Sequence, residues 1–278
     1  MLISVINNKG GVGKTTTSAN LGHALARKNR RVLVVDMDSQ CNATDILVRG
    51  QGLLTSATLY DLIAKNSIPN PQACILATRY PNLFLLPNIP ETATLEPELI
   101  SSVPDSLFRL RNNIRQYALE NFDFTFLDCP PNLGTFVILA LYSSDFVVVP
   151  TEAGSKHSSE GLIKAVEFIN EIQQKGNPDL RFLRLLITKV DRRTSISKAV
   201  VDQIRTTFPK DKVFKTQIPV NTDLQKAEFM GQTIFQYRSN ALSAIAYSHL
   251  ADELVNLTKK AHNTPTELKN DQEALLYS

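Results

Sequence analysis

The sequence of 278 residues contains no tryptophan and only three cysteines, and its formal net charge is only +3. The cysteines, Cys41, Cys74 and Cys129, are odd in number and widely spaced, which argues against a disulfide framework and against a zinc knuckle. So small a net charge identifies no partner by itself. Apolar residues make up 43% of the chain, which is enough for a core and excludes a disordered or fibrous protein.

Long hydrophobic runs are also missing. The longest one, Phe136 to Tyr142, is far shorter than the roughly 20 residues of a membrane-spanning helix. Met1 leads directly into a strand-like segment without a basic region or a cleavage site, so no secretory signal is expected. Only six residues precede Asn7, which leaves no room there for a helix-turn-helix and speaks against sequence-specific operator binding. We expect a cytoplasmic protein.

Short apolar runs alternate with helical patterns along the chain. The runs are rich in Val, Ile, Leu and Phe without clean alternation, which is typical of strands covered on both faces. The strands are expected at Leu2–Ile6, Val32–Val35, Leu83–Leu86, Phe124–Leu127, Phe146–Val149 and Phe182–Ile187. The helices are expected at Thr15–Lys28, Asp105–Glu120, His157–Lys175, Ser195–Thr207 and Ala241–Lys260. This order predicts a doubly wound α/β fold with a mostly parallel sheet flanked by helices.

The chain reads as a single domain over residues 1–262. Residues 50–104 are less regular and proline-rich, and we expect an elaborated surface region with one embedded strand there. Residues 263–278 are polar and are expected to form a flexible C-terminal tail.

A phosphate-binding loop follows the first strand, since residues 3–17 read ISVINNKGGVGKTTT. Gly10, Gly11 and Gly13 have no side chain to keep phosphate oxygens from the backbone N–H groups. Lys14 supplies a positive charge for the β- and γ-phosphates, and Thr15 can ligate Mg²⁺. The alternative, glycines that merely form a tight turn, is disfavoured by the strand-to-helix position of GGVGKT. The motif predicts a P-loop NTPase fold.

Two acidic elements accompany the loop. Asp128 directly follows the strand Phe124–Leu127, at the sheet edge where open α/β folds bind ligands, and we assign it to magnesium through water. Asp36 and Asp38 end the neighbouring run, with their side chains on the same side of an extended backbone. We expect Asp38 to orient water or to act as a general base. For Asp36, a structural role and a functional role are both open. The metal ligands expected are Thr15, Asp38 and Asp128.

The chain closely resembles the ParA family of partition ATPases, which belongs to the ParA/MinD superfamily of deviant Walker A P-loop ATPases. The resemblance rests on NNKGGVGKTTTSANLGHAL, VVDMDSQCNAT, FLDCPPNLG and IPVNTDLQKAEFMGQTI, and it covers about residues 1–260 apart from the detail of 50–93. In that family two subunits enclose two ATP molecules. The resemblance therefore implies ATP hydrolysis with Mg²⁺ by a homodimer.

The resemblance also assigns roles to single residues. Lys9, which begins the deviant K-G-G-x-G-K-T loop after Asn8, matches the lysine that reaches the partner's nucleotide. Such a lysine neutralises transition-state charge only after dimerisation, which couples hydrolysis to assembly. Lys9, Lys14 and Asp38 are the expected catalytic residues. The expected nucleotide-binding residues are Lys9, Gly10, Gly11, Val12, Gly13, Lys14, Thr15, Thr16, Pro219 and Asn221.

Two positions depart from the usual family pattern. Ser39 stands where proline is common, and Cys41 where glycine is usual, so we expect altered stiffness of this segment without lost chemistry. Cys41 is either a tolerated small side chain or a reactive thiol, and it lacks the basic sequence neighbour that would favour a thiolate. Cys129 has no iron–sulfur ligand spacing, which argues against the nitrogenase-reductase branch.

Positive charge is concentrated near the C-terminal third. Residues 181–226 hold eleven Lys and Arg against four Asp, a net +7 that leaves −4 for the rest of the chain. This stretch is either a set of solvated helix faces or a surface that attracts duplex DNA without reading its sequence. By resemblance, Arg193 matches an arginine used for non-specific DNA contact. Relatives often carry a second arginine at the position of Val220, and here we expect that contact either to be absent or to be moved to a neighbour such as Lys215 or Lys226.

The segment from Pro219 to Asn221 resembles the family segment that lines the adenine, and the loop Thr188–Asp191 is expected nearby. A purely structural turn is the alternative.

Three functions compete for such a chain. The first is a nucleoid-associated partition or positioning ATPase that works with a ParB-like or analogous adaptor. The second is a membrane-cycling septum-positioning ATPase, which needs an amphipathic C-terminal anchor that residues 264–278 do not show. The third is an ATP-dependent metabolic ligase or amidase, which needs an added substrate pocket that the sequence of residues 50–104 neither displays nor excludes. The resemblance favours the first, with no membrane partner.

Overall fold

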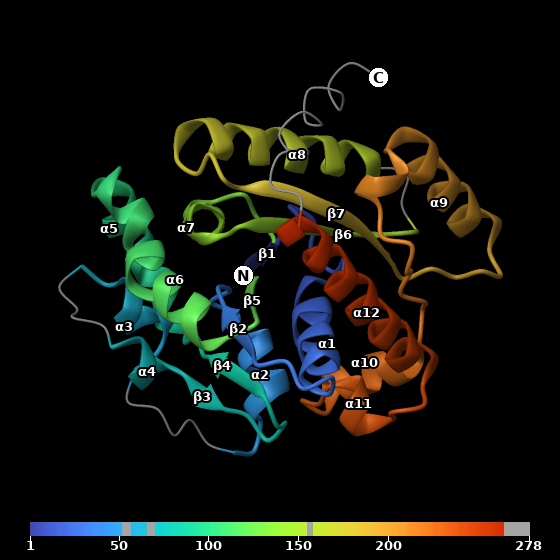
Figure 1. Ribbon diagram of the computed structural model, residues 1–278, viewed down its shortest axis with the longest axis horizontal. Coiled ribbons are helices and arrows are strands. Elements are labelled where there is room, and N and C mark those ends of the chain that lie inside the picture. Colours follow the sequence, from blue (N-terminus) through green and yellow to red (C-terminus); the bar gives the residue numbers. More distant parts are fainter. Residues whose placement is uncertain (52–56, 66–69, 155–157, 264–278) are drawn as a thin grey trace.

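The computed structural model describes residues 1–51, 57–65, 70–154 and 158–263 (Figure 1). A seven-stranded sheet has the order β3-β4-β2-β5-β1-β6-β7, and every pair is parallel except β3 with β4. The strands are β1 (Leu2–Val5), β2 (Val32–Asp36), β3 (Leu76–Ala77), β4 (Leu83–Leu86), β5 (Phe124–Asp128), β6 (Phe146–Glu152) and β7 (Arg181–Thr188). The predicted mostly parallel sheet is confirmed.

Helices cover both faces of this sheet (Figure 1). One face packs against α3 (Leu59–Ile63), α6 (Arg109–Asn121), α7 (Thr135–Ser143), α8 (Ser158–Lys175) and α9 (Ser195–Thr207). The other packs against α1 (Lys14–Ala26), α2 (Asn42–Val48), α11 (Ile234–Tyr237) and α12 (Leu242–Asn263). The remaining helices are α4 (Pro71–Cys74), α5 (Glu96–Ser101) and α10 (Thr222–Phe229), with 3₁₀ turns η1 (Pro90–Leu95), η2 (Asp105–Phe108) and η3 (Lys210–Lys212).

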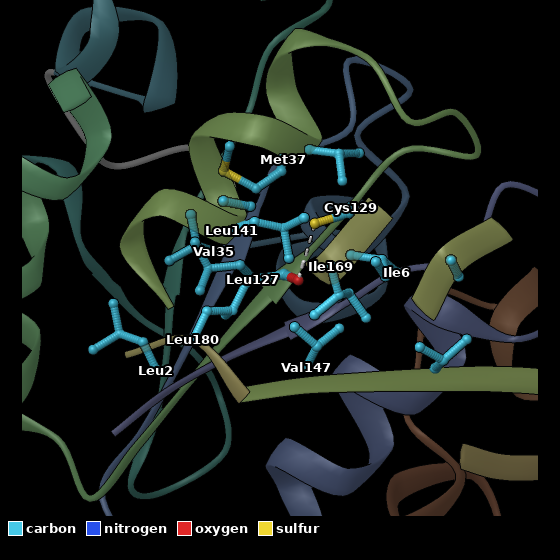
Figure 2. Close-up of a cluster of buried hydrophobic side chains, with 14 of the residues drawn as sticks. Leu2, Ile6, Val35, Met37, Leu127, Cys129, Leu141, Val147, Ile169 and Leu180 are labelled. Atoms are coloured by element: carbon cyan, nitrogen blue, oxygen red, sulfur yellow. Dashed lines mark hydrogen bonds between the residues drawn. The ribbon is translucent and has the colours of Figure 1, made fainter. Parts of the chain in front are cut away.

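Alternation along each strand divides its side chains between two cores. Figure 2 shows the first core, where Leu2, Val35 and Leu127 of three strands meet Leu141 and Ile169 of α7 and α8. The intervening strand residues enter the second core with α1 and α12. Strands buried on both faces show no polar alternation, which is why their apolar runs were recognisable.

Residues 50–104 differ from the prediction. One embedded strand was expected there, but the described part holds two, β3 and β4, together with the short helices α3, α4 and α5. β3 is only two residues long and pairs antiparallel at the sheet edge. A strand of that length carries no readable period.

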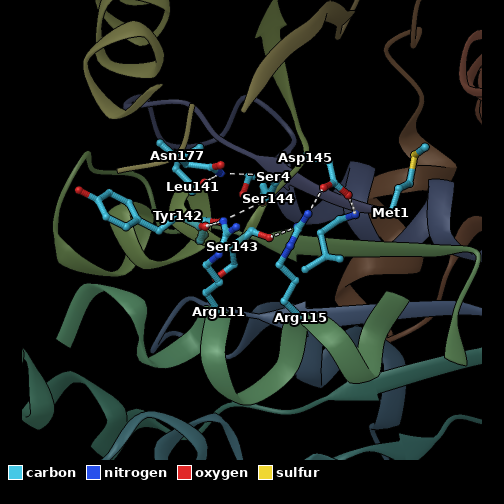
Figure 3. Close-up of polar contacts among 12 residues, drawn as sticks. Met1, Ser4, Arg111, Arg115, Leu141, Tyr142, Ser143, Ser144, Asp145 and Asn177 are labelled. Atoms are coloured by element: carbon cyan, nitrogen blue, oxygen red, sulfur yellow. Dashed lines mark hydrogen bonds and ion pairs between the residues drawn. The ribbon is translucent and has the colours of Figure 1, made fainter. Parts of the chain in front are cut away.

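Polar contacts hold the end of the sheet opposite the phosphate loop, where β1 and β6 begin (Figure 3). Asp145 accepts a hydrogen bond from the backbone N–H of Leu2 at 2.7 Å and forms an ion pair with Arg115 of α6. Asn177 donates to the carbonyl oxygens of Leu141 and Ser144 at 2.7 and 2.8 Å. These contacts satisfy backbone groups where α7 enters β6 and fix β1, which carries the loop.

Helix α12 ends at Asn263. The tail was predicted from residue 263, so its first residue belongs to this helix. The rest of the predicted tail and the predicted lack of an amphipathic anchor concern residues 264–278, which lie outside the described part. Among the described residues, no helix combines the length and apolar character needed to cross a membrane.

A buried histidine in α1 gives a prediction for the pH dependence of stability. The ring of His23 lies 4.3 Å from that of Tyr80, and its Nδ1 lies 2.6 Å from Oγ1 of Thr233. Burial lowers the pKa of His23 to about 4, and the charge of Arg27 adds to the shift. Between pH 6.5 and 4 the unfolded chain therefore binds a proton here that the folded one does not, so stability falls as pH falls.

Urea unfolding at pH 7 and pH 5 checks this prediction. The wild-type free energy of unfolding should lose about 2 kcal/mol through His23. Asp36 and Asp128 act in the opposite sense, because their raised pKa values favour the folded state as pH falls. His23→Gln retains both acids, so the difference between the two proteins isolates the histidine. Parallel stability profiles for the two proteins would contradict the assignment.

Candidate functional site

The phosphate loop joins the end of β1 to the start of α1. Gly11 and Gly13 have φ angles of +75° and +91°, in the left-handed region that glycine adopts without the penalty of a β-carbon. Gly13 directly precedes α1. Nζ of Lys14 donates to the carbonyl oxygen of Lys9 at 3.2 Å, across the loop. The loop therefore presents its backbone at a helix N-terminus, a geometry that suits an anion.

Strand β7 fastens the loop from the side. Oγ1 of Thr188 donates to the carbonyl oxygen of Val12 at 2.8 Å and lies 3.1 Å from that of Thr151. The side chain of Val12 is buried, so this predicted nucleotide-binding residue offers only its backbone.

A cleft of about 430 Å³ opens over the loop. This volume falls in the range of small-molecule sites. Nine predicted site residues line it: Gly10, Gly11, Gly13, Lys14, Thr15, Thr16, Asp38, Pro219 and Asn221. Thr188 also lines it, in agreement with the expectation for the loop 188–191. Lys189 of the same expected loop lines it too, and the lining residues that sequence reasoning missed include Asp45, Pro131, Leu224, Glu228 and Tyr247.

Asp128 lies buried at the end of β5, next to the loop but outside the cleft lining. Its Oδ1 accepts a hydrogen bond from Ser18 at 2.8 Å, and the hydroxyl of Thr15 is close enough to the same carboxylate to lower its pKa. Burial raises the pKa of Asp128 to about 6, against the opposing effect of these hydrogen bonds and of Lys14. Its Oδ2 has no hydrogen-bond partner among the described residues.

These oxygens fit magnesium. No group of three or more His, Cys, Asp or Glu side chains suited to a metal occurs in the described part of the chain. Mg²⁺ bound together with phosphates needs only one or two protein oxygens besides water. The hydroxyl of Thr15 beside a carboxylate with an unpartnered buried oxygen supplies such a set, and Asp38 lines the same cleft.

Asp36 is fully buried and used within the fold. It accepts hydrogen bonds from the backbone N–H and the hydroxyl of Thr44 at 2.8 and 2.7 Å, and from the N–H of Asp38 at 3.2 Å. Burial, aided by the charge of Asp128, raises the pKa of Asp36 to about 7. Asp36 does not line the cleft. Its contacts favour the structural role, which is to hold α2 and Asp38 in place.

Lys9 points to its own chain's Glu152, with which it forms an ion pair. Its side chain is 42% exposed and does not line the cleft. The backbone N–H of Lys9 donates to Oδ1 of Asn7 at 2.9 Å. One subunit thus holds Lys14 inside the site and Lys9 outside it, so the cross-subunit role of Lys9 stays a prediction.

The chain has well-matched relatives. A family model described as an AAA domain matches residues 1–182. The sporulation initiation inhibitor protein Soj of Bacillus subtilis is 36% identical over 256 residues, covering 91% of this chain and 97% of its own. The chromosome partitioning protein ParA of Myxococcus xanthus is 35% identical over 254 residues, covering 91% and 87% respectively. The chain belongs to the ParA family of partition ATPases.

Solved structures share the fold of this ParA-family chain. The structure entitled cobyrinic acid a,c-diamide synthase from Mycobacterium smegmatis with bound ADP and magnesium has a TM-score of 0.77 and 28% identity, covering 94% of this chain and 96% of that one. Apo McdA of Cyanothece has a TM-score of 0.78 and 23% identity, covering 91% and 98%. At 23% identity the second comparison shows the fold alone.

The backbone at Cys41 accounts for the expectation, drawn from the family resemblance, of a glycine at this position. This residue has a φ of +55°, which costs an L side chain energy and a glycine none. Burial and nearby acids, Asp36 first, raise the pKa of the Cys41 thiol to about 12. The reactive-thiol alternative is therefore disfavoured.

The three residues predicted to contact DNA lie in different settings. Arg193 has an 85% exposed side chain and donates twice to Asp191, at 2.9 Å each. That pairing lowers the pKa of Asp191 to about 2. Lys226 is exposed on α10. Lys215 lines a second groove together with Arg192, Lys198 and Arg205 of the same basic stretch. The groove also includes Leu242, Ile245 and His249, which the sequence had not singled out.

Proposed function

We propose that this chain is a partition or positioning ATPase that encloses ATP and Mg²⁺ between two copies of itself, binds duplex DNA without sequence preference, and moves cargo with a ParB-like or analogous adaptor at the nucleoid. The observation that carries the proposal is the single cleft that unites the glycine loop, Asp38 and the segment Pro219–Asn221. Partition proteins among the relatives and ADP with magnesium in a neighbouring structure support it.

The residues of the cleft divide the work of hydrolysis. The loop N–H groups and Lys14 hold the phosphates, and Thr15 with Asp128 would hold Mg²⁺, which neutralises phosphate charge when it is bound. Asp38 lines the cleft next to the loop, and the backbone N–H of Gln40 donates to its Oδ1 at 3.0 Å. A carboxylate so placed can orient the attacking water and accept its proton. Hydrolysis therefore depends on Asp38 more than binding does.

Dimerisation would change the partner of Lys9. Its ion pair with Glu152 is partly solvent-exposed, and an exposed pair contributes little to stability. Release of Lys9 toward the phosphates of a second subunit is thus inexpensive. This favours a lysine that senses the assembled state.

DNA binding is assigned to the second groove, a hollow of about 960 Å³ beside α9 and the start of α12. Arg192, Lys198, Arg205 and Lys215 line it, and Asp191 and Asp202 are its acidic residues. Pro219 lines both this groove and the nucleotide cleft. The backbone of Val190 is hydrogen-bonded on both sides of Pro219, to Ile218 and Val220, at 3.0 and 3.1 Å. This shared wall gives nucleotide a physical route to the groove.

A salt series tests the DNA assignment. We expect wild-type protein to bind duplexes of any sequence with ATP and Mg²⁺, and weakly or not at all with ADP. Each phosphate contact contributes about −0.9 to the slope of log affinity against log salt. Arg205→Ala and Lys215→Ala should each reduce the magnitude of this slope by about one contact per subunit, and Arg193→Ala and Lys226→Ala should weaken binding uniformly across sequences.

The matched control is Lys175→Ala, which removes an exposed lysine of α8 that pairs with Glu171 and lies outside both clefts. It should leave the slope unchanged. ATP-loaded wild-type protein that ignores DNA at low salt would overturn the nucleoid-based function.

The match to the M. smegmatis structure favours a second candidate, ATP-dependent amidation or ligation of a carboxylate. The two candidates differ in what stimulates hydrolysis. A partition ATPase responds to DNA and its adaptor, whereas an amidating enzyme consumes ATP in proportion to a carboxylate acceptor and an amine donor. Phosphate release with DNA alone, measured without any acceptor, favours partition.

A further inference from the structure

Lys189 is a cation of the nucleotide cleft that the expected phosphate-binding set does not include. It follows β7 directly and has a φ of +51°, an uncommon conformation for a residue with a side chain. Its Nζ lies 4.0 Å from the position that a β-carbon on Gly11 would occupy. The ammonium group is thus placed over the phosphate loop.

The backbone holds Lys189 in this place from both sides. Thr188, on one side, donates its hydroxyl to the carbonyl oxygen of Val12 in the loop. Val190, on the other, is hydrogen-bonded to Ile218 and Val220 beside the opposite wall of the cleft. Residues held in sparsely populated backbone regions are often found at ligand clamps. The side chain of Lys189 therefore lies between the phosphate loop and the segment 218–220, where a nucleotide would bind.

Glu228 supplies the opposing charge. It lies on α10, lines the cleft, and accepts a hydrogen bond from the hydroxyl of Thr16 at the start of α1. Burial raises the pKa of Glu228, while the Thr16 hydrogen bond and the charge of Lys189 act against that shift. A carboxylate is therefore bound by one hydroxyl of the phosphate loop and attracted by the cation above it.

This arrangement matches the needs of a phosphate group. The carboxylate of Glu228 interacts with the hydroxyl of Thr16 and the ammonium group of Lys189, and phosphate oxygens accept hydrogen bonds from the same kinds of group. A carboxylate and a phosphate repel each other, so both cannot share these donors closely. From this geometry we infer that Lys189 binds the phosphates of its own subunit's nucleotide, and that Glu228 occupies the donors as a placeholder until nucleotide displaces it.

The inference rests on the proposed function and predicts changes of opposite sign. Lys189→Met removes a charge-assisted contact and should weaken ADP binding about tenfold. Glu228→Gln keeps an oxygen for the Thr16 hydroxyl but removes the competing charge, so ADP should bind more tightly. Calorimetric titration of dilute protein with ADP and Mg²⁺ measures both changes and avoids hydrolysis. Lys189→Arg retains the charge and should restore most of the affinity.

Two comparisons make the test specific. Adenosine has no phosphate, so its affinity should be the same for wild type and Lys189→Met. Lys175→Met makes the same substitution away from the cleft and should leave ADP binding unchanged. Circular dichroism and thermal unfolding establish that each variant is folded. If Lys189→Met fails to fold, Glu228→Gln tests the inference by itself.

The outcomes separate this inference from the proposed function. Wild-type protein that binds no ADP would overturn both. Wild-type binding together with an unchanged affinity in Lys189→Met, or a weakened affinity in Glu228→Gln, would overturn the role of this pair alone.

Discussion

Lys14→Ala should bind neither ATP nor ADP measurably, whereas Lys9→Ala should retain most of its nucleotide affinity and lose dimerisation and turnover. Lys14 is buried beside Asp128 and Asp38, and its ammonium lies within the loop. Burial lowers the pKa of Lys14, while Asp128, Cys129 and Asp38 oppose that shift. A buried positive charge interacts strongly with a polyphosphate, because little water screens it. We therefore expect Lys14→Ala to lose nucleotide affinity by at least about 100-fold.

The contrast with Lys9 depends on which way each lysine points. Lys9 pairs with Glu152 outside the cleft, so its removal takes nothing from the subunit's own phosphate site. Calorimetry on dilute protein reports affinity, and light scattering with ATP reports assembly. Equal losses of ATP affinity in both variants would contradict the cross-subunit role of Lys9, and Lys14→Ala with wild-type affinity would overturn the phosphate cradle itself.

The sheet was predictable because its central strands are buried on both faces. The predicted ends of the strands fall at most a few residues from the observed ones, and Leu83–Leu86 is the same in both. The same kind of burial caused the helix α7 to be missed. Its sequence, TFVILALYS, is apolar on nearly all sides, so no 3.6-residue period distinguishes it from a buried strand. The structure shows that this segment is a helix, which packs between α6 and α8.

The site was predictable where its residues are close together in sequence. The glycine loop and Asp38 belong to local motifs, and the structure places them in one cleft. Lys189 and Glu228 carry no such motif, since they reach the cleft from β7 and α10, which lie more than 150 residues from the loop. The only sequence signal was the expectation that residues 188–191 lie near the adenine. A contact made by tertiary packing, such as Thr16 with Glu228, has no signature in a single sequence.

Asp38→Ala should bind ATP and dimerise but hydrolyse ATP about 10²–10⁴ times more slowly than wild type. The reason is the division of labour in the cleft. Lys14, the loop glycines and Asp38 line the same cleft, and in the proposed function Lys14 and the loop amides hold the phosphates, whereas the carboxylate of Asp38 orients water and contributes little to holding an anion. Removing Asp38 therefore removes stabilisation that is needed in the transition state more than in the bound state. Its buried neighbour Asp36, hydrogen-bonded to Thr44, keeps the segment in place.

Phosphate release under saturating ATP and Mg²⁺, with and without DNA, measures the rate of Asp38→Ala, and calorimetry measures its affinity for ATP. Asp252→Ala is the matched control, because Asp252 pairs with Lys28 on the surface and lies outside the cleft. It should hydrolyse at the wild-type rate. Because a variant that binds ATP without consuming it would stay in the dimeric state, Asp38→Ala should also remain on DNA longer than wild type. Wild-type turnover in Asp38→Ala would remove Asp38 from the chemistry, and a loss of ATP binding equal to that of Lys14→Ala would assign it to the phosphate site instead.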